Sequence, residues 1–169
     1  DSAFWKLPVV SDDFEGTVGT DGARFLFSPR GVVSRFRNVP YEMTRDFLHL
    51  ILHCVFRQPF ETRREHPLNW SYACDICVEA IAMEMCGARF ACSDDVQRNA
   101  LLKQLRSAVD ALTPAQVYRL IERPRNADAL PSLSRDESRL AELLNESEPL
   151  FVRDSHGFWN LTEPERIDD

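Results

Sequence analysis

The amino-acid sequence predicts an α+β fold, with a small sheet near the start of the chain and helices in the remainder. Short runs rich in β-branched and aromatic residues, separated by a Pro/Gly turn, occupy about residues 23–37. From about residue 41 onward, apolar residues recur at the three- and four-residue spacing of amphipathic helices. A chain of 169 residues is long enough to bury one core of this kind.

The predicted sheet is a two-stranded hairpin. Thr20–Gly22 is a turn signal, and Ala23–Phe27 is the first expected strand. Ser28–Gly31 contains the proline and glycine of a second turn, and Val32–Phe36 has the composition of a second strand. We therefore expect two short strands over about residues 23–37.

Two helices are expected after the hairpin. The first covers about residues 41–56, and Pro59 ends it. The second covers about residues 69–86, with Asn69 as its N-cap and Gly87 as its stop.

The sequence of the C-terminal half predicts three more helices, at about residues 94–111, 114–122 and 135–146. Ser93 caps the first, and Thr113 and Ser134 begin capping boxes for the other two. The segment Arg123–Leu133 contains two prolines and is the expected linker. We expect a core over residues 1–92 and a helical extension over 93–169, together forming one compact domain.

Charge and hydropathy restrict the partners and the location of the protein. The formal net charge of −7 and the pI of about 5.1 argue against nucleic acid, which calls for a clustered positive surface. No apolar run approaches the roughly 20 residues that cross a bilayer, and no signal-peptide pattern is seen. The sequence predicts a cytoplasmic protein. Because the chain opens at Asp1 without Met, we expect it to be a piece of a longer protein.

The five cysteines lie mostly in apolar, helical surroundings, which is typical of a reducing compartment and of buried hydrophobic roles. An alternative is a four-thiolate zinc site built from Cys74, Cys77, Cys86 and Cys92. Structural zinc sites usually hold such a C-x-x-C pair on a turn, whereas this pair falls within a predicted helix. The buried role is therefore the favoured interpretation.

A candidate metal site lies on the first predicted helix. His49 and His53 are four residues apart, so their imidazoles lie close enough on one helix face to bind one cation. At 100° per residue, they share a side with Glu42 and Asp46, opposite a broad apolar arc. The alternative is a chance spacing of two histidines on a solvated helix face.

The next predicted helix offers carboxylates. Asp75 and Glu79 are one turn apart, and a carboxylate is a usual third ligand beside two histidines. We expect Asp75 to be that ligand, with Glu79 as a ligand or as support for one. The alternative is that both are surface acids paired with Arg63 or Arg64. His66, in the loop between the helices, is expected to be solvated.

Five segments of the sequence form a recognisable series: Gly19–Gly22, Phe25–Pro29, Leu48–Arg57, Trp70–Asp75 and Asp154–Trp159. In this order they resemble the bacterial zincin-like metallopeptidase domain that precedes von Willebrand factor A-like domains. The resemblance implies a zincin-like fold, in which a small sheet packs on the histidine helix and residues 151–160 return to the core. It also implies bound Zn²⁺, a C-terminal von Willebrand factor A-like domain and a MoxR-type AAA ATPase as partner.

Two positions depart from the zincin pattern. Such peptidases carry H-E-x-x-H, whose glutamate takes a proton from metal-bound water, but Leu50 stands at that position. Gln58, a poor zinc ligand, stands where some relatives carry a third histidine. The resemblance therefore implies zinc binding without the usual general base.

The favoured function is a zinc-binding domain that is non-proteolytic or an altered hydrolase. Zinc would be held by His49, His53 and Asp75, with His156 as a candidate fourth ligand that would fill the coordination sphere. One alternative is an active metallopeptidase in which Glu79 or Asp154 acts as the base. The other is a metal-free interaction module that binds partners through the helices of residues 94–146.

Overall fold

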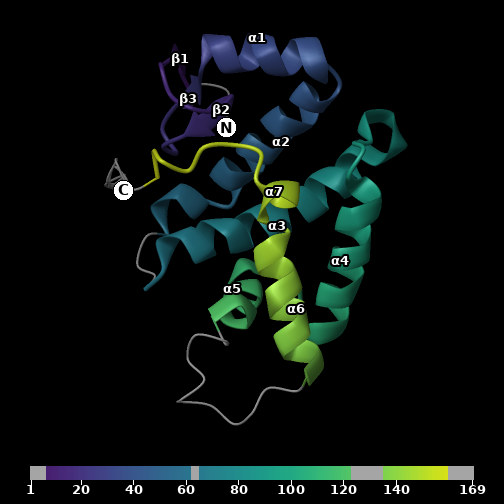
Figure 1. Cartoon of the computed structure of the whole chain (residues 1–169). Helices are drawn as coiled ribbons and strands as arrows, with labels where there is room; N and C mark the ends of the chain where they lie inside the picture. Colours follow the sequence, from purple (N-terminus) through teal and green to yellow (C-terminus); the bar gives the residue numbers. More distant parts are fainter. Residues whose placement is uncertain (1–6, 62–64, 123–134, 160–169) are drawn as a thin grey trace. The chain divides into compact units, whose positions relative to one another are not determined.

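The computed structural model describes residues 7–61, 65–122 and 135–159. Within these ranges the chain is α+β, as predicted, with seven α-helices and one three-stranded sheet. It divides into two compact units (Figure 1). The first contains the chain up to Arg64 together with the segment from Arg153 onward, and the second runs from Glu65 to Val152.

The sheet of the first unit has the strand order β1-β3-β2. Strand β1 (Val9–Ser11) runs parallel to β3 (Phe25–Phe27), and β2 (Val18–Thr20) runs antiparallel to β3. The expected strand over residues 23–27 is confirmed as β3. Asp21 closes the turn before β3, because its Oδ1 accepts hydrogen bonds from the backbone of the two residues that follow Gly22.

The prediction of a second strand over residues 32–36 is wrong. Helix α1 (Pro29–Asn38) occupies this stretch. Ser28 is its N-cap, and the Ser28 Oγ accepts a hydrogen bond of 3.3 Å from the Gly31 amide. Pro29 sits in the first turn, where its fixed φ favours a helix and its missing N–H is not needed. These start signals outweigh the β propensity of Val32 and Val33, and the predicted turn is a helix N-terminus.

Helix α2 (Glu42–Val55) confirms the predicted histidine helix. Leu50 and Cys54 pack against Val18 and Phe25 of the sheet. The alternative of a solvated helix face is wrong for the histidine pair, because His49 and His53 are fully buried. The returning segment, residues 153–159, covers that side of α2 with Asp154 and Trp159.

The returning segment runs beside β2, and Figure 1 shows it in yellow. The amide of Ser155 donates a 2.9 Å hydrogen bond to the Val18 carbonyl, and Ser155 bridges Gly19 in parallel fashion. One residue earlier, the Arg153 guanidinium forms an ion pair with buried Asp46 of α2. A backbone bridge and an ion pair thus fix both sides of Asp154.

The second unit consists of helices. They are α3 (Pro67–Cys86), α4 (Asp95–Ala108), α5 (Pro114–Glu122), α6 (Arg135–Glu146) and α7 (Glu148–Phe151), with a short 3₁₀ turn, η3 (Gly87–Phe90), after α3. Another 3₁₀ turn, η2 (Gln58–Phe60), follows α2 in the first unit. The core of the second unit is aliphatic and aromatic, built around Ile76, Leu102, Leu105, Ile121, Leu144 and Phe151.

Helix termini in the second unit match the sequence signals unevenly. Gly87 ends α3 with φ of 53°, and the Thr113 Oγ1 accepts from the Gln116 amide, as predicted. Asn69 is not the N-cap of α3. Pro67 starts the helix two residues earlier, and the Asn69 side chain donates instead to Glu122. Ser134 and the predicted linker lie outside the described residues.

The cysteines, all within the described residues, form no disulfide. Cys74 and Cys77 lie on α3 and are buried, as the sequence predicted. Burial raises the pKa of the Cys77 thiol to about 12 and that of Cys54 to about 11. Metals bind the thiolate, so a thiol that stays protonated in this way does not favour the four-thiolate alternative.

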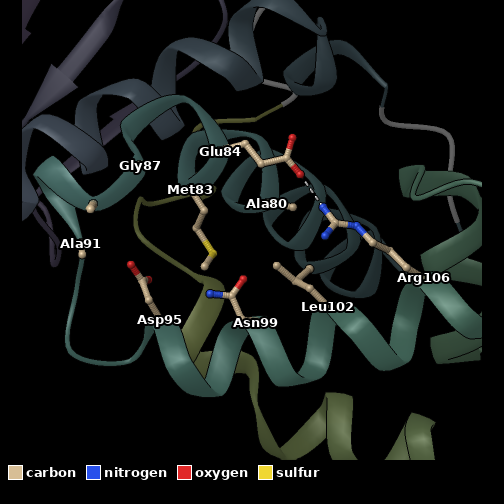
Figure 2. Close-up of a pocket in the computed structure, with 10 residues that line it drawn as sticks. Ala80, Met83, Glu84, Gly87, Ala91, Asp95, Asn99, Leu102 and Arg106 are labelled. Carbon is tan, nitrogen blue, oxygen red and sulfur yellow. Dashed lines mark hydrogen bonds and ion pairs between the residues drawn. The ribbon is translucent and has the colours of Figure 1, made fainter.

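A pocket of about 310 Å³ with a mixed, mostly apolar lining opens on the second unit between the end of α3 and α4 (Figure 2). Asp95 and Asn99 lie on its α4 side, and Met83 faces them from α3. Glu84 and Arg106 form a 2.6 Å ion pair at its edge, so these two charges compensate each other. In the described parts of the chain, no helix combines the length and hydropathy that a bilayer crossing demands.

Candidate metal centre

Three ionisable side chains of the first unit converge in its interior. His49 and His53 come from successive turns of α2, and Asp154 comes from the returning segment. All three side chains are buried, and their ligand atoms lie within 4.8 Å of one another. The four-residue spacing seen in the sequence accounts for the histidine pair, whose ring centroids are 4.8 Å apart.

The nitrogen–oxygen distances between the histidines and Asp154 are close to the ligand–ligand distances around a tetrahedral zinc ion. The Nε2 atoms of His49 and His53 lie 3.6 Å and 3.5 Å from Asp154 Oδ1. These distances exceed the roughly 2.7–3.2 Å of a good N–H···O hydrogen bond. Ligand atoms about 2.0–2.2 Å from a tetrahedral zinc ion are about 3.3–3.6 Å from each other. These two separations fit side chains that could hold one metal ion.

Gln58 sets the orientation of His53. The Gln58 Oε1 lies 2.6 Å from His53 Nδ1, and a carbonyl oxygen can only accept, so Nδ1 carries the proton. In a neutral imidazole this leaves the lone pair on Nε2, which faces Asp154. A hydrogen bond to the distal nitrogen is the usual support of a metal-binding histidine. Gln58, which the sequence indicates to be a poor zinc ligand, therefore orients a candidate ligand.

Asp154 is a buried carboxylate in its charged form. Burial alone would raise the pKa of Asp154, but the imidazoles of His156 and His53 outweigh it and hold this pKa well below its ordinary value. Within the described residues, Asp154 Oδ2 is buried and accepts no hydrogen bond. A buried oxygen of this kind points to an ion or water that satisfies it.

His156 and Trp159 border this group. The His156 Nε2 lies 3.1 Å from Asp154 Oδ1, at hydrogen-bond distance, and its ring meets that of His53 at 5.3 Å between centroids. The indole of Trp159 packs against both rings, at 4.3 Å from His156 and 5.1 Å from His53. The structure therefore brings predicted residue His156 to the site, in contact with Asp154.

The remaining predicted residues lie on the second unit. Asp75 is buried on α3, and its role as third ligand stays a prediction from the sequence. Glu79 is also buried, with its Oε1 3.6 Å from Arg98 Nε. His66 is partly exposed, and its Nε2 lies 3.3 Å from Glu122 Oε2. It pairs with that carboxylate instead of being simply solvated.

Removal of the Gln58 acceptor is expected to weaken metal binding. In Gln58→Ala, His53 loses the partner that fixes its tautomer and ring orientation, and such losses typically cost about 10–100-fold in metal affinity. Gln58→Glu keeps an acceptor oxygen and should retain most of the affinity. Competition with a zinc chelator measures the zinc affinity of wild type, Gln58→Ala and Gln58→Glu. Equal affinity in Gln58→Ala and wild type would contradict this role.

Gly19 is expected to matter because the returning segment passes so close to it. A Cβ at Gly19 would lie 2.9 Å from the Ser155 carbonyl oxygen and 3.0 Å from the Phe158 ring. Gly19→Ala should displace the segment that carries Asp154, destabilise the protein by about 1–3 kcal/mol and weaken metal binding. At Gly157, on the same segment, the nearest atom would be 3.7 Å away.

Gly157→Ala is therefore the matched control. Chelator competition and urea unfolding of both variants test the effect. An unchanged metal affinity in Gly19→Ala, together with an unchanged free energy of unfolding, would show that the backbone approach at Gly19 is not needed.

Comparison of the chain with protein-family models, with curated proteins and with solved structures finds no match. The case for the site therefore depends on its own geometry.

Proposed function

We propose that the chain is a zinc-binding domain in which His49, His53 and Asp154 hold the ion. The observation that carries this proposal is the approach of His53 to Asp154. His53 Nε2 faces the carboxylate oxygen at 3.5 Å, which exceeds the usual hydrogen-bond distance, while its Nδ1 lies 2.6 Å from Gln58 Oε1. A buried imidazole nitrogen and a buried carboxylate oxygen at this separation are well placed to share one metal ion.

The donor set favours zinc among the common metals. Imidazole nitrogen and carboxylate oxygen are both usual zinc ligands, and neither calcium nor magnesium commonly takes two imidazoles. Zinc also accepts tetrahedral geometry, to which the 3.5 Å and 3.6 Å separations correspond. The helix supplies two ligands at fixed spacing and the returning segment supplies the third.

We infer a binding role in preference to proteolysis of the H-E-x-x-H kind. Leu50 occupies the position of the general base and is buried against Val18 and Phe25 of the sheet. Asp154 acts as a ligand in this proposal, so it is not available as the base. The negative charge of Glu79, the other candidate base, is compensated by the guanidinium of Arg98. These features support a zinc site without the usual peptidase chemistry.

Two further expectations rest on the sequence alone. Asp75 is proposed as an additional carboxylate ligand, which Asp75→Asn would test by lower zinc affinity. The resemblance of the motifs motivates the proposal of a von Willebrand factor A-like domain in a longer protein and of a MoxR-type AAA ATPase as partner. Co-purification of the full-length protein with such an ATPase tests that part separately.

Zinc is expected to stabilise the fold, because it binds the folded arrangement and the ligands are separated in sequence. At a free zinc concentration 100 times the dissociation constant, mass action adds about 2.7 kcal/mol to the free energy of unfolding. For a chain of this length that corresponds to a rise in Tm of roughly 5–11 °C.

Thermal unfolding with zinc and with chelator measures this shift, with calcium as the control ion. A Tm that is the same with zinc, calcium and chelator would favour the metal-free interaction module.

A further inference from the structure

A buried ion pair joins the two elements that carry the proposed ligands of the first unit. The Arg153 guanidinium contacts Asp46 Oδ1, and the two side chains are 2% and 1% exposed. Asp46 lies on α2, three residues before His49, and Arg153 directly precedes Asp154. The ion pair is therefore less than one helical turn from one proposed ligand and one residue from another.

A second arginine holds Asp46 from the other side. The Arg35 Nε of α1 donates to Asp46 Oδ2 at 2.9 Å, and its Nη2 donates to Glu42 Oε2 at 2.7 Å. The Arg153 Nη1 lies 3.6 Å from the same Glu42 oxygen. Two guanidinium groups and two carboxylates thus form one network, and their formal charges cancel. Such a network influences a nearby cation mainly through the position of the elements that it joins, and not through a net charge.

The position of Asp154 matters because metal binds the closed arrangement of the returning segment. His49 and His53 are held at fixed spacing by α2, whereas Asp154 reaches them only when residues 153–159 lie against that helix. If this segment were closed for about a tenth of the time, the apparent metal affinity would fall about tenfold. A contact that keeps the segment closed in the metal-free protein therefore raises the affinity.

We propose that Arg153 and Asp46 are positioning residues, which hold Asp154 beside the histidine pair before the metal binds. This inference rests on the metal site proposed above and names what sets the affinity of that site. Arg153 acts on the returning segment directly. Asp46 acts through Arg153, and Arg35 only supports Asp46.

The test compares two arginine variants of the whole chain. Arg153→Met removes the ion pair to the segment but leaves Asp46 paired with Arg35, so no buried carboxylate loses its last counter-charge. Arg35→Met is the matched control, because it removes the other partner of the same carboxylate and keeps the contact to the segment.

Competition with a zinc chelator measures the zinc affinity of both variants and of wild type. Arg153→Met should bind zinc about tenfold more weakly or worse, and Arg35→Met should lose less than about threefold. Arg153→Lys keeps the positive charge but not the planar guanidinium, so it should recover part of the loss.

Hydrogen exchange gives a second readout, which a general loss of stability would not change at one site alone. The Ser155 amide of the segment donates to the Val18 carbonyl at 2.9 Å, and the Ser28 amide donates to the Thr17 carbonyl at 3.0 Å. In metal-free wild type both amides should be protected. In metal-free Arg153→Met, Ser155 should lose protection while Ser28 keeps it, and saturating zinc should restore it.

Three outcomes overturn the inference. A Ser155 amide that exchanges freely in metal-free wild type shows that the ion pair does not hold the segment. Equal zinc affinity in Arg153→Met and wild type, or equal losses in the two arginine variants, overturns the inference and leaves the metal site standing. Failure of wild type to bind zinc at all overturns the metal site together with this inference, which is a distinguishable result.

Discussion

Replacement of His53 by alanine is expected to reduce zinc affinity by more than about 100-fold. Loss of a supporting hydrogen bond alone typically costs about 10–100-fold, and this substitution removes the ligand itself together with its contact to Gln58. His49→Ala should have a comparable effect, because the His49 Nε2 is equivalently placed at 3.6 Å from Asp154 Oδ1. Competition with a chelator of known affinity measures both variants.

His66→Ala is the matched control for these two variants. His66 is half exposed and pairs with Glu122 in the second unit, so its loss should leave zinc affinity unchanged. Circular dichroism of the metal-free variants shows whether each still folds. If folded His49→Ala or His53→Ala binds zinc as tightly as wild type, the assignment of that histidine as a ligand is wrong.

Asp154→Asn is expected to weaken zinc binding to a similar degree, with little change in side-chain volume. The variant removes the negative charge that faces the two histidines and replaces one carboxylate oxygen by an amide group, which cannot ligate through its nitrogen. Because the pKa of Asp154 is held well below its ordinary value, wild type keeps this charge throughout the neutral and mildly acidic range.

Asp110→Asn, at an exposed position of the second unit, is the control for Asp154→Asn. Isothermal titration with zinc compares the two. Asp154 of wild type is charged at pH 7. Weaker zinc binding by Asp154→Asn at this pH therefore reports the loss of a ligand and not a change in the protonation of Asp154. Full zinc affinity in folded Asp154→Asn would remove this carboxylate from the site.

The fold class and most helices follow from local sequence signals, but the composition of residues 32–36 predicts the wrong element. Val32–Phe36 has strand composition, yet Ser28 and Pro29 start a helix that includes it. A cap and a first-turn proline act on the backbone directly, whereas β propensity expresses how a side chain fits a sheet surface. The same reasoning would have placed the start of α3 at Pro67 instead of Asn69.

The histidine pair of the site was predictable because its spacing is local to one helix. Its burial was not, because the cover comes from residues 153–159, about a hundred positions further along the chain. Asp154, a candidate base in the sequence, lies beside both histidines and is proposed as a ligand. The role of Gln58 follows from a turn of 3₁₀ helix after α2, which brings it back to His53. Sequence spacing alone gives no sign of that return.

Elemental analysis of the purified wild-type chain, after zinc has been offered and free metal removed by dialysis, tests the central claim most directly. The proposed site predicts about one zinc ion per chain. Zinc well below that ratio in correctly folded protein would contradict it, and would leave His49, His53 and Asp154 as a buried cluster held together without metal.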